Sequence, residues 1–149
     1  MGRRTVTLLL ILMAAAGAAG CTGPVRSFGV YASKAANTAD QAASAVATAE
    51  LTVRAATEGR TFGRTAAQTL AEAAEDAASV QGTFDAIQPP DSRSDRLRQE
   101  LDELLQQAVS ILEDLRTAAR RGEVGALASL AKPLPDLSDK LDQFAQAHR

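Results

Sequence analysis

The sequence predicts an all-α protein, an up-down-up-down antiparallel four-helix bundle that follows an N-terminal signal helix. Three observations support this fold class. Apolar residues recur at alternating intervals of three and four through four successive segments, the pattern of a helix with one buried face. Short breaks near Gly59, Pro89–Pro90 and Gly122 separate the segments, so successive helices should turn back on one another. No segment shows the two-residue alternation typical of a half-buried strand.

Residues 1–20 are organised like an export signal. Arg3 and Arg4 form a basic start, and residues 5–20 carry no charge. This uncharged stretch is 16 residues long, whereas a membrane-spanning helix needs roughly 18–20. The segment is therefore predicted to be a signal peptide and not a spanning anchor.

Cys21 is the only cysteine of the chain and follows the small residues Ala18, Ala19 and Gly20. This arrangement resembles the lipobox of bacterial lipoprotein precursors, which more often carries leucine where Ala18 stands. The resemblance implies cleavage between Gly20 and Cys21, diacylglycerol on the Cys21 thiol, and a fatty acid such as palmitate on the new amino group. Residues 21–24 would be a lipidated tether, and two or three acyl chains suffice for stable membrane anchoring. The implied location is the extracytoplasmic face of the cell membrane.

Two other interpretations of the N-terminus stay open. An ordinary secretory signal that ends at an Ala-x-Ala-like site would leave Cys21 as an incidental free thiol. Arg3 and Arg4 also suggest twin-arginine export, although the flanking residues fit that motif poorly.

The predicted domain spans residues 25–149, and its first two helices are rich in alanine. They cover about residues 25–57 and 61–88, and Pro89–Pro90 ends the second because proline cannot donate the next helical hydrogen bond. Alanine buries little area, so these helices should pack closely but hold weakly. Their apolar stripes are Phe28, Ala32, Ala35, Ala39, Ala42, Val46, Ala49 and Val53, then Phe62, Ala66, Thr69, Ala73, Ala77, Val80, Phe84 and Ile87.

The third predicted helix covers about residues 92–121 and carries the strongest leucine stripe. Asp91, Ser92 or Ser94 can cap its start. The fourth covers about residues 123–148 with a kink at Pro133 and Pro135; the apolar spacing continues past both prolines, which favours a kinked helix or two coaxial helices. The two stripes are Leu97, Leu101, Leu104, Ala108, Ile111, Leu115 and Ala118, then Leu127, Leu130, Leu134, Leu137, Leu141 and Phe144.

The composition leaves little material for catalysis or metal binding. The only histidine is His148, next to the last residue, and Met1 and Met13 would leave with the signal peptide. No Glu-x-x-His motif, glycine-rich phosphate loop or nucleophile elbow occurs. We therefore expect no catalytic residue, no metal, no cofactor and no enzymatic activity. The chain has a formal net charge of −2, which argues against a nucleic-acid partner.

The acidic residues between the apolar stripes are interpreted as solvated helix faces. They form three groups: Glu72, Glu75 and Asp76; Glu100, Asp102 and Glu103; and Glu113 and Asp114.

The predicted topology gathers most aromatic residues at the membrane-proximal end of the bundle. A hydrophobic plug that closes the core is the favoured interpretation, and a pocket or membrane-facing patch for an acyl chain is the alternative. The residues concerned are Phe28, Tyr31, Phe84, Leu97, Leu141 and Phe144.

Arginines gather at the opposite tip of the predicted bundle, with Glu58 and Glu123 as partial compensation. They form a candidate docking surface for an anionic envelope partner. Their simpler interpretation, which we favour at this stage, is solvation of the tip and stabilisation of a helix C-terminus. The arginines are Arg54, Arg60, Arg64, Arg116, Arg120 and Arg121.

Together these features predict a membrane-anchored lipoprotein whose helical domain serves as an envelope interaction or scaffold module. The alternative is a carrier that binds a lipid or other apolar ligand within the bundle. The expected partners are the membrane, reached through the lipid anchor, and an unidentified envelope protein or lipid. The alanine- and arginine-rich composition resembles that of small envelope lipoproteins of actinobacteria, a likeness that implies no particular activity.

Overall fold

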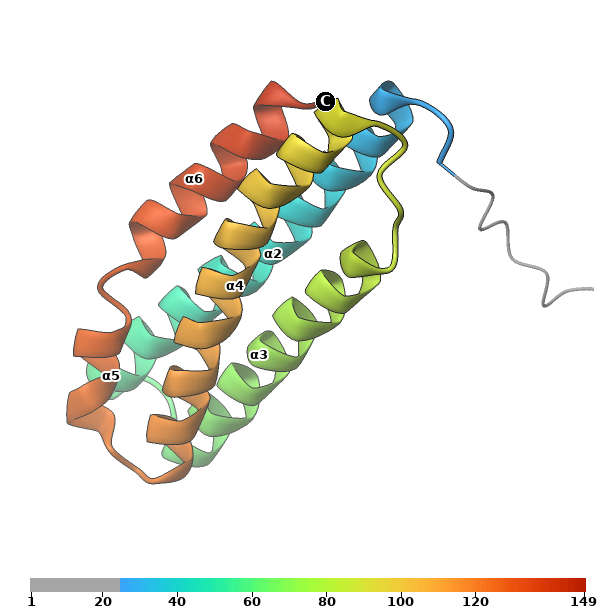
Figure 1. Ribbon diagram of the computed structural model, residues 1–149. Helices are drawn as coiled ribbons and strands as arrows, with labels where there is room; N and C mark the ends of the chain where they lie inside the picture. The colour runs from blue at the N-terminus through green and yellow to red at the C-terminus, as the bar shows by residue number, and fades with distance from the viewer. Residues whose placement is uncertain (1–24) are drawn as a thin grey trace, which may run out of the picture.

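The computed structural model describes residues 25–149, which form five α-helices and no strand (Figure 1). The signal peptide, Gly20 and Cys21 lie outside the described residues. Within residues 25–149, no helix is long and apolar enough to cross a membrane. The helices are α2 (Phe28–Thr57), α3 (Gly63–Asp85), α4 (Ser92–Arg120), α5 (Val124–Leu130) and α6 (Leu134–Ala147).

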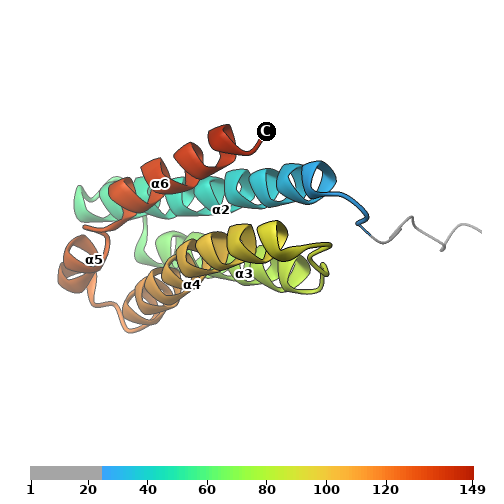
Figure 2. The ribbon, with the colours of Figure 1, turned by 45° about the horizontal axis from the view of Figure 1, so that its top comes forward.

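Four of the helices lie side by side, and the short α5 lies across one end (Figures 1 and 2). We call the end where α2 and α4 begin, and where α3 and α6 end, the proximal end. Arg149, just after α6, pairs with Asp40 in the first half of α2, with 2.8 Å between its Nη2 and both carboxylate oxygens. We call the opposite end, built from residues 54–66 and 116–127, the tip.

The bundle is compressed along one diagonal. Helices α2 and α4 contact each other, and each of them also contacts α3, α5 and α6. Helices α3 and α6 do not contact each other. The buried face of α2 consists mostly of alanine, including Ala35, Ala39, Ala42 and Ala49, each fully buried. Because alanine holds neighbouring backbones only a short distance apart, α2 lies directly against α4 across the centre.

Side-chain caps and glycine turns set several helix ends. Asp91 accepts hydrogen bonds at 2.8 Å from both the backbone N–H and the hydroxyl of Ser94, which selects Asp91 among the expected caps of α4. These bonds lower the pKa of the Asp91 carboxyl. Gly59 and Gly122 follow α2 and α4 with φ of 68° and 72°, a left-handed conformation that glycine adopts without steric cost.

Several helix ends differ from the sequence-based expectation. The first helix begins at Phe28 and not at residue 25, because Ser27 caps it. The fourth segment consists of two separate helices, with residues 131–133 as a turn between them. Pro133 and Pro135 lack the N–H groups that would continue α5, and Pro135 instead lies in the first turn of α6, where proline is tolerated.

One expected core residue is exposed. Phe62 was assigned to the apolar stripe of the second helix, but it precedes α3 as the N-cap residue and is 84% exposed. Leu70 and Ala74 are buried in α3, while Thr69 and Val80 of the expected stripe lie at its edge. Ala66, Ala73, Ala77 and Phe84 of the expected stripe are buried, so the stripe is confirmed within α3 and differs only at its edges and at Phe62, which precedes the helix.

Candidate functional site

The tip brings together the arginines that the sequence placed there. The small recess described below is lined by residues from the end of α2, the start of α3, the end of α4 and α5, so these segments meet at one place. Three of the six arginines pair with a nearby glutamate: Arg54 with Glu50 at 2.5 Å, Arg60 with Glu58 at 2.5 Å, and Arg116 with Glu113 at 3.3 Å. Each pair joins two residues that are at most four positions apart in the sequence, and together the pairs partly neutralise the positive charge of the tip.

The other three arginines of the tip form no ion pair within the described residues. They are Arg64, Arg120 and Arg121, and all three are exposed. Residues 58–64 and 120–124 contain four arginines and two glutamates, a local excess of two positive charges in a chain of net charge −2. The tip is therefore opposite in charge to the molecule as a whole.

Apolar side chains accompany these charges. Phe62 is 84% exposed and Val124 is 43% exposed, although both are large hydrophobic residues. A recess of about 70 Å³ lies between the helix ends beside them. Its lining is small or apolar and consists of Ala56, Thr61, Gly63, Ala66, Ala119, Gly122, Val124 and Leu127. The arginines are neighbours in sequence of these lining residues, and Arg120 and Arg121 themselves line a separate hollow of about 350 Å³ with Thr117. The tip thus combines an apolar depression with exposed cations close to it in the chain.

At the proximal end, the residues of the expected apolar pocket are packed into the core. Tyr31, Phe84 and Leu141 are fully buried, and the Tyr31 and Phe84 rings lie with centroids 5.6 Å apart. Leu97 and Phe144 are nearly buried members of the same core cluster. Phe28 lies at the edge of this cluster under the Arg93 guanidinium, which is 3.6 Å from its ring centroid. This packing has the character of a plug.

A polar cluster missed by the sequence analysis lies beside that plug. Arg98 of α4 donates hydrogen bonds to the backbone oxygens of Asp85, at 2.8 Å, and Ile87, at 3.0 Å. Its Nε also lies 3.6 Å from an oxygen of Asp102. Arg98 therefore holds the end of α3 against α4 and supplies donors to carbonyls that the ending helix leaves unpaired.

Asp102 does not lie on a solvated face as expected. Its Oδ1 is buried and, like the hydroxyl of Tyr31, finds no hydrogen-bond partner within the described residues. Burial raises the pKa of the Asp102 carboxyl above the usual 3.8, and the positive charge of Arg98 offsets this only in part. Burial likewise raises the pKa of the Tyr31 hydroxyl. The acidic residues Glu72, Glu75 and Asp76 are exposed, in line with their interpretation.

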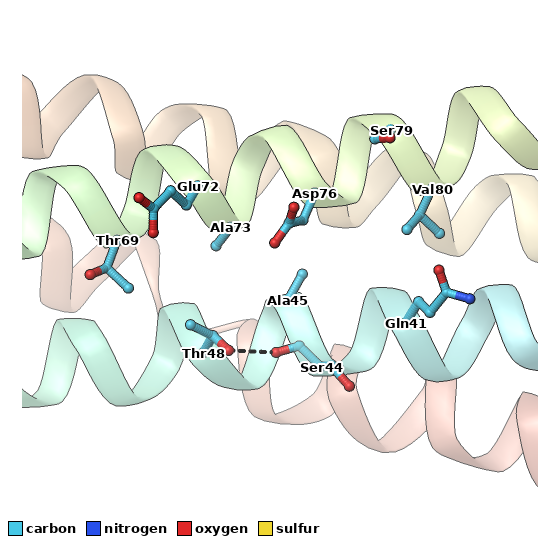
Figure 3. Close-up of a pocket in the computed structure, with 10 residues that line it drawn as sticks. All are labelled: Gln41, Ser44, Ala45, Thr48, Thr69, Glu72, Ala73, Asp76, Ser79 and Val80. Atoms are coloured by element: carbon cyan, nitrogen blue, oxygen red, sulfur yellow. Dashed lines mark hydrogen bonds between the residues drawn. The ribbon is translucent and has the colours of Figure 1, made fainter.

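A groove of about 470 Å³ runs between α2 and α3 (Figure 3). Ala45 and Ala73 lie between the two helices at its floor, and their side chains are too small to fill the space. The hydroxyl of Thr48 is occupied by a 2.8 Å hydrogen bond to the backbone oxygen of Ser44. The other lining residues are Gln41, Thr69, Glu72, Asp76, Ser79 and Val80. No histidine or cysteine is among them.

The described residues contain no group of three or more histidine, cysteine, aspartate or glutamate side chains placed to hold a metal ion. No protein-family model matches the chain, and comparisons with curated proteins and with solved structures found no match. The candidate site therefore depends on its own geometry, and the tip presents two exposed apolar residues, Phe62 and Val124, together with three arginines that form no ion pair within residues 25–149.

Proposed function

We propose that this protein is a membrane-anchored lipoprotein whose helical domain acts as a non-enzymatic interaction module of the cell envelope. The observation that carries the proposal is the tip, where the exposed ring of Phe62 lies among the unpaired cations Arg64, Arg120 and Arg121. Arginine and aromatic residues supply a large share of binding energy at protein interfaces.

The anchor in this proposal rests on the sequence alone. The only cysteine directly follows the uncharged stretch and the small residues 18–20. Lipidation of the Cys21 thiol would be followed by hydrolysis of the peptide bond between Gly20 and Cys21, which removes residues 1–20. The tether of residues 21–24 is then so short that the domain lies next to the membrane.

The proposal includes an up-down-up-down antiparallel four-helix bundle in which α5 and α6 together form the fourth arm. Contacts between α2 and α3, α3 and α4, α4 and α6, and α6 and α2 support this arrangement. In such a bundle the tether and the tip lie at opposite ends. Helix α2 has 30 residues, so at about 1.5 Å per residue it holds the tip roughly 45 Å from the proximal end.

The alternative function, a carrier of a lipid or other apolar ligand, calls for a cavity among the proximal aromatic residues. Their packing into the core supports the plug and gives the carrier no observation of its own. Native mass spectrometry of the purified protein tests this point. For an interaction module, we expect the native mass to equal that of the protein with its covalent acyl chains. An additional mass of one non-covalently bound lipid per protein would favour the carrier.

Site-specific photo-cross-linking in cells tests the interaction module itself. A photoreactive phenylalanine analogue is placed at Phe62, and at Leu51 as the control, because Leu51 is also a large exposed hydrophobic residue, at 61%, but lies on α2 outside the tip. We expect a discrete cross-linked envelope protein from position 62 and none from position 51. Equal labelling from both positions, or none from position 62, would contradict the proposal.

A further inference from the structure

We infer that the tip binds an acidic segment of a partner protein, in which one aliphatic side chain enters the recess beside Phe62 while neighbouring carboxylates pair with the arginines. This inference rests on the proposed function and specifies its partner by chemistry. It draws on the size of the recess, on the unpaired guanidinium groups and on the position of the tip in the fold.

The recess has the size of a single side-chain site. Its volume of about 70 Å³ is several times the roughly 10–15 Å³ that a cavity needs to hold one water molecule. That space accommodates the end of one branched aliphatic side chain. Its wall contains the fully buried Leu127 and the half-exposed Val124, so a partner's methyl groups would find apolar contacts there.

The exposed arginines of the tip, Arg64, Arg120 and Arg121, can each pair with a carboxylate of the same partner segment. A guanidinium group presents a planar fork of N–H donors that fits a carboxylate with two parallel hydrogen bonds. Arg64, Arg120 and Arg121 form no ion pair within the described residues, so a partner carboxylate would not have to displace an internal one. The N-cap residue Phe62 also provides no side-chain acceptor for the first turn of α3, so the N–H groups of that turn have no side-chain cap.

The position of the tip favours a protein over the anchoring membrane as the partner. The tip lies at the far end of α2 from residue 25 (Figure 1), and residues 25–27 connect directly to the proposed tether. A bilayer that holds Cys21 therefore lies next to the proximal end. A protein segment can approach the tip from the other side without any reorientation of the domain.

Fluorescence anisotropy with a labelled probe peptide, Gly-Asp-Glu-Leu-Glu-Asp-Gly, tests the inference on the purified full chain in a non-ionic detergent. A second peptide replaces its leucine by serine, and vesicles of phosphatidylglycerol provide the lipid arm in a sedimentation assay. The tip variant carries Arg64→Gln, Arg120→Gln and Arg121→Gln. The matched control carries Arg26→Gln, Lys34→Gln and Arg96→Gln, three exposed cations remote from the tip whose loss changes the net charge equally.

We expect the leucine peptide to bind the wild type and the control variant with the same affinity. The tip variant should bind about tenfold more weakly, because it loses three exposed charge pairs that each contribute modestly to affinity. The change Phe62→Ala should weaken binding about fivefold or more, while Leu51→Ala leaves it unchanged. The serine peptide should bind more weakly than the leucine peptide because it leaves the recess empty.

Three results would overturn the inference. These are equal binding of the leucine and serine peptides, equal loss of affinity in the tip and control variants, and absence of peptide binding together with vesicle binding that the tip variant loses and the control variant keeps. The last comparison uses two variants with the same acyl anchor, so a difference between them reports on the tip. Each of the three results leaves the proposed interaction module standing if position 62 still cross-links to an envelope protein. Loss of that cross-link, with peptide binding intact, would instead contradict the proposed function alone.

Discussion

Replacing Arg98 by methionine should destabilise the protein far more than replacing an arginine of similar exposure elsewhere on α4. Methionine keeps much of the apolar stem but removes the guanidinium. The change therefore deletes the hydrogen bonds to the backbone oxygens of Asp85 and Ile87 and leaves Asp102 without its nearest cation.

The magnitude follows from these contacts. Hydrogen bonds to charged groups contribute about 1.5–3 kcal/mol each. The side chain of Arg98 is 23% exposed, so water replaces part of what is lost, and we expect a total of about 2–3 kcal/mol. For a domain of this size, each kcal/mol lowers Tm by about 3–5 °C. The expected fall in Tm is thus about 6–15 °C.

Arg116→Met is the matched control. The side chain of Arg116 is 28% exposed and makes one ion pair, with Glu113 three residues earlier on the same helix. Pairs of this kind contribute about 0.2–0.5 kcal/mol, so Tm should fall by no more than about 2 °C. Thermal unfolding followed by far-UV circular dichroism measures both variants. Equal Tm values for Arg98→Met and Arg116→Met would refute the assigned role of Arg98.

Three further predictions concern the core and its titration. Tyr31→Phe should raise the free energy of unfolding by about 1 kcal/mol in urea titrations, because a buried hydroxyl without a partner costs roughly 1–3 kcal/mol; a loss of stability would show that the hydroxyl is satisfied. Ala42→Leu should lower that free energy by about 1–3 kcal/mol, since the site is fully buried and α2 packs closely on α4; an unchanged urea midpoint would contradict this packing. The raised pKa of Asp102 means that the folded state binds a proton more readily than the unfolded state, so its contribution to stability falls as pH rises from 3.8 through the folded pKa. Asp102→Asn should remove that part of the slope of Tm against pH, and an unchanged slope would contradict it.

The helical class could be predicted because its signals are local. The 3,4 spacing of apolar residues and the turns near Gly59 and Gly122 depend only on neighbours in the sequence, and the described residues are all-helical with left-handed glycines at both turns. Phe62 shows the limit of this reasoning. Its spacing fits the stripe of α3, but the helix begins after it, and only the packed structure reveals that its ring is exposed.

The candidate site could likewise be predicted from the sequence only in part. Grouping the arginines required only the order of the helices and their approximate lengths. The recess could not be predicted, because its depth depends on where alanine and glycine residues of four segments meet. The role of Arg98 could not be predicted, because its partners Asp85 and Ile87 lie outside α4 and only the packed structure brings them together. The partial burial of Asp102 also depends on packing that the spacing of acidic residues does not reveal.

The central claim is that the protein is a lipid-anchored module of the envelope. Intact mass and membrane fractionation of the expressed full chain, beside its Cys21→Ala variant, test this claim most directly. We expect the wild type to lose residues 1–20, gain the mass of acyl chains and sediment with membranes, while the variant gains no acyl mass. Release of both proteins in soluble form with no added mass would contradict the account.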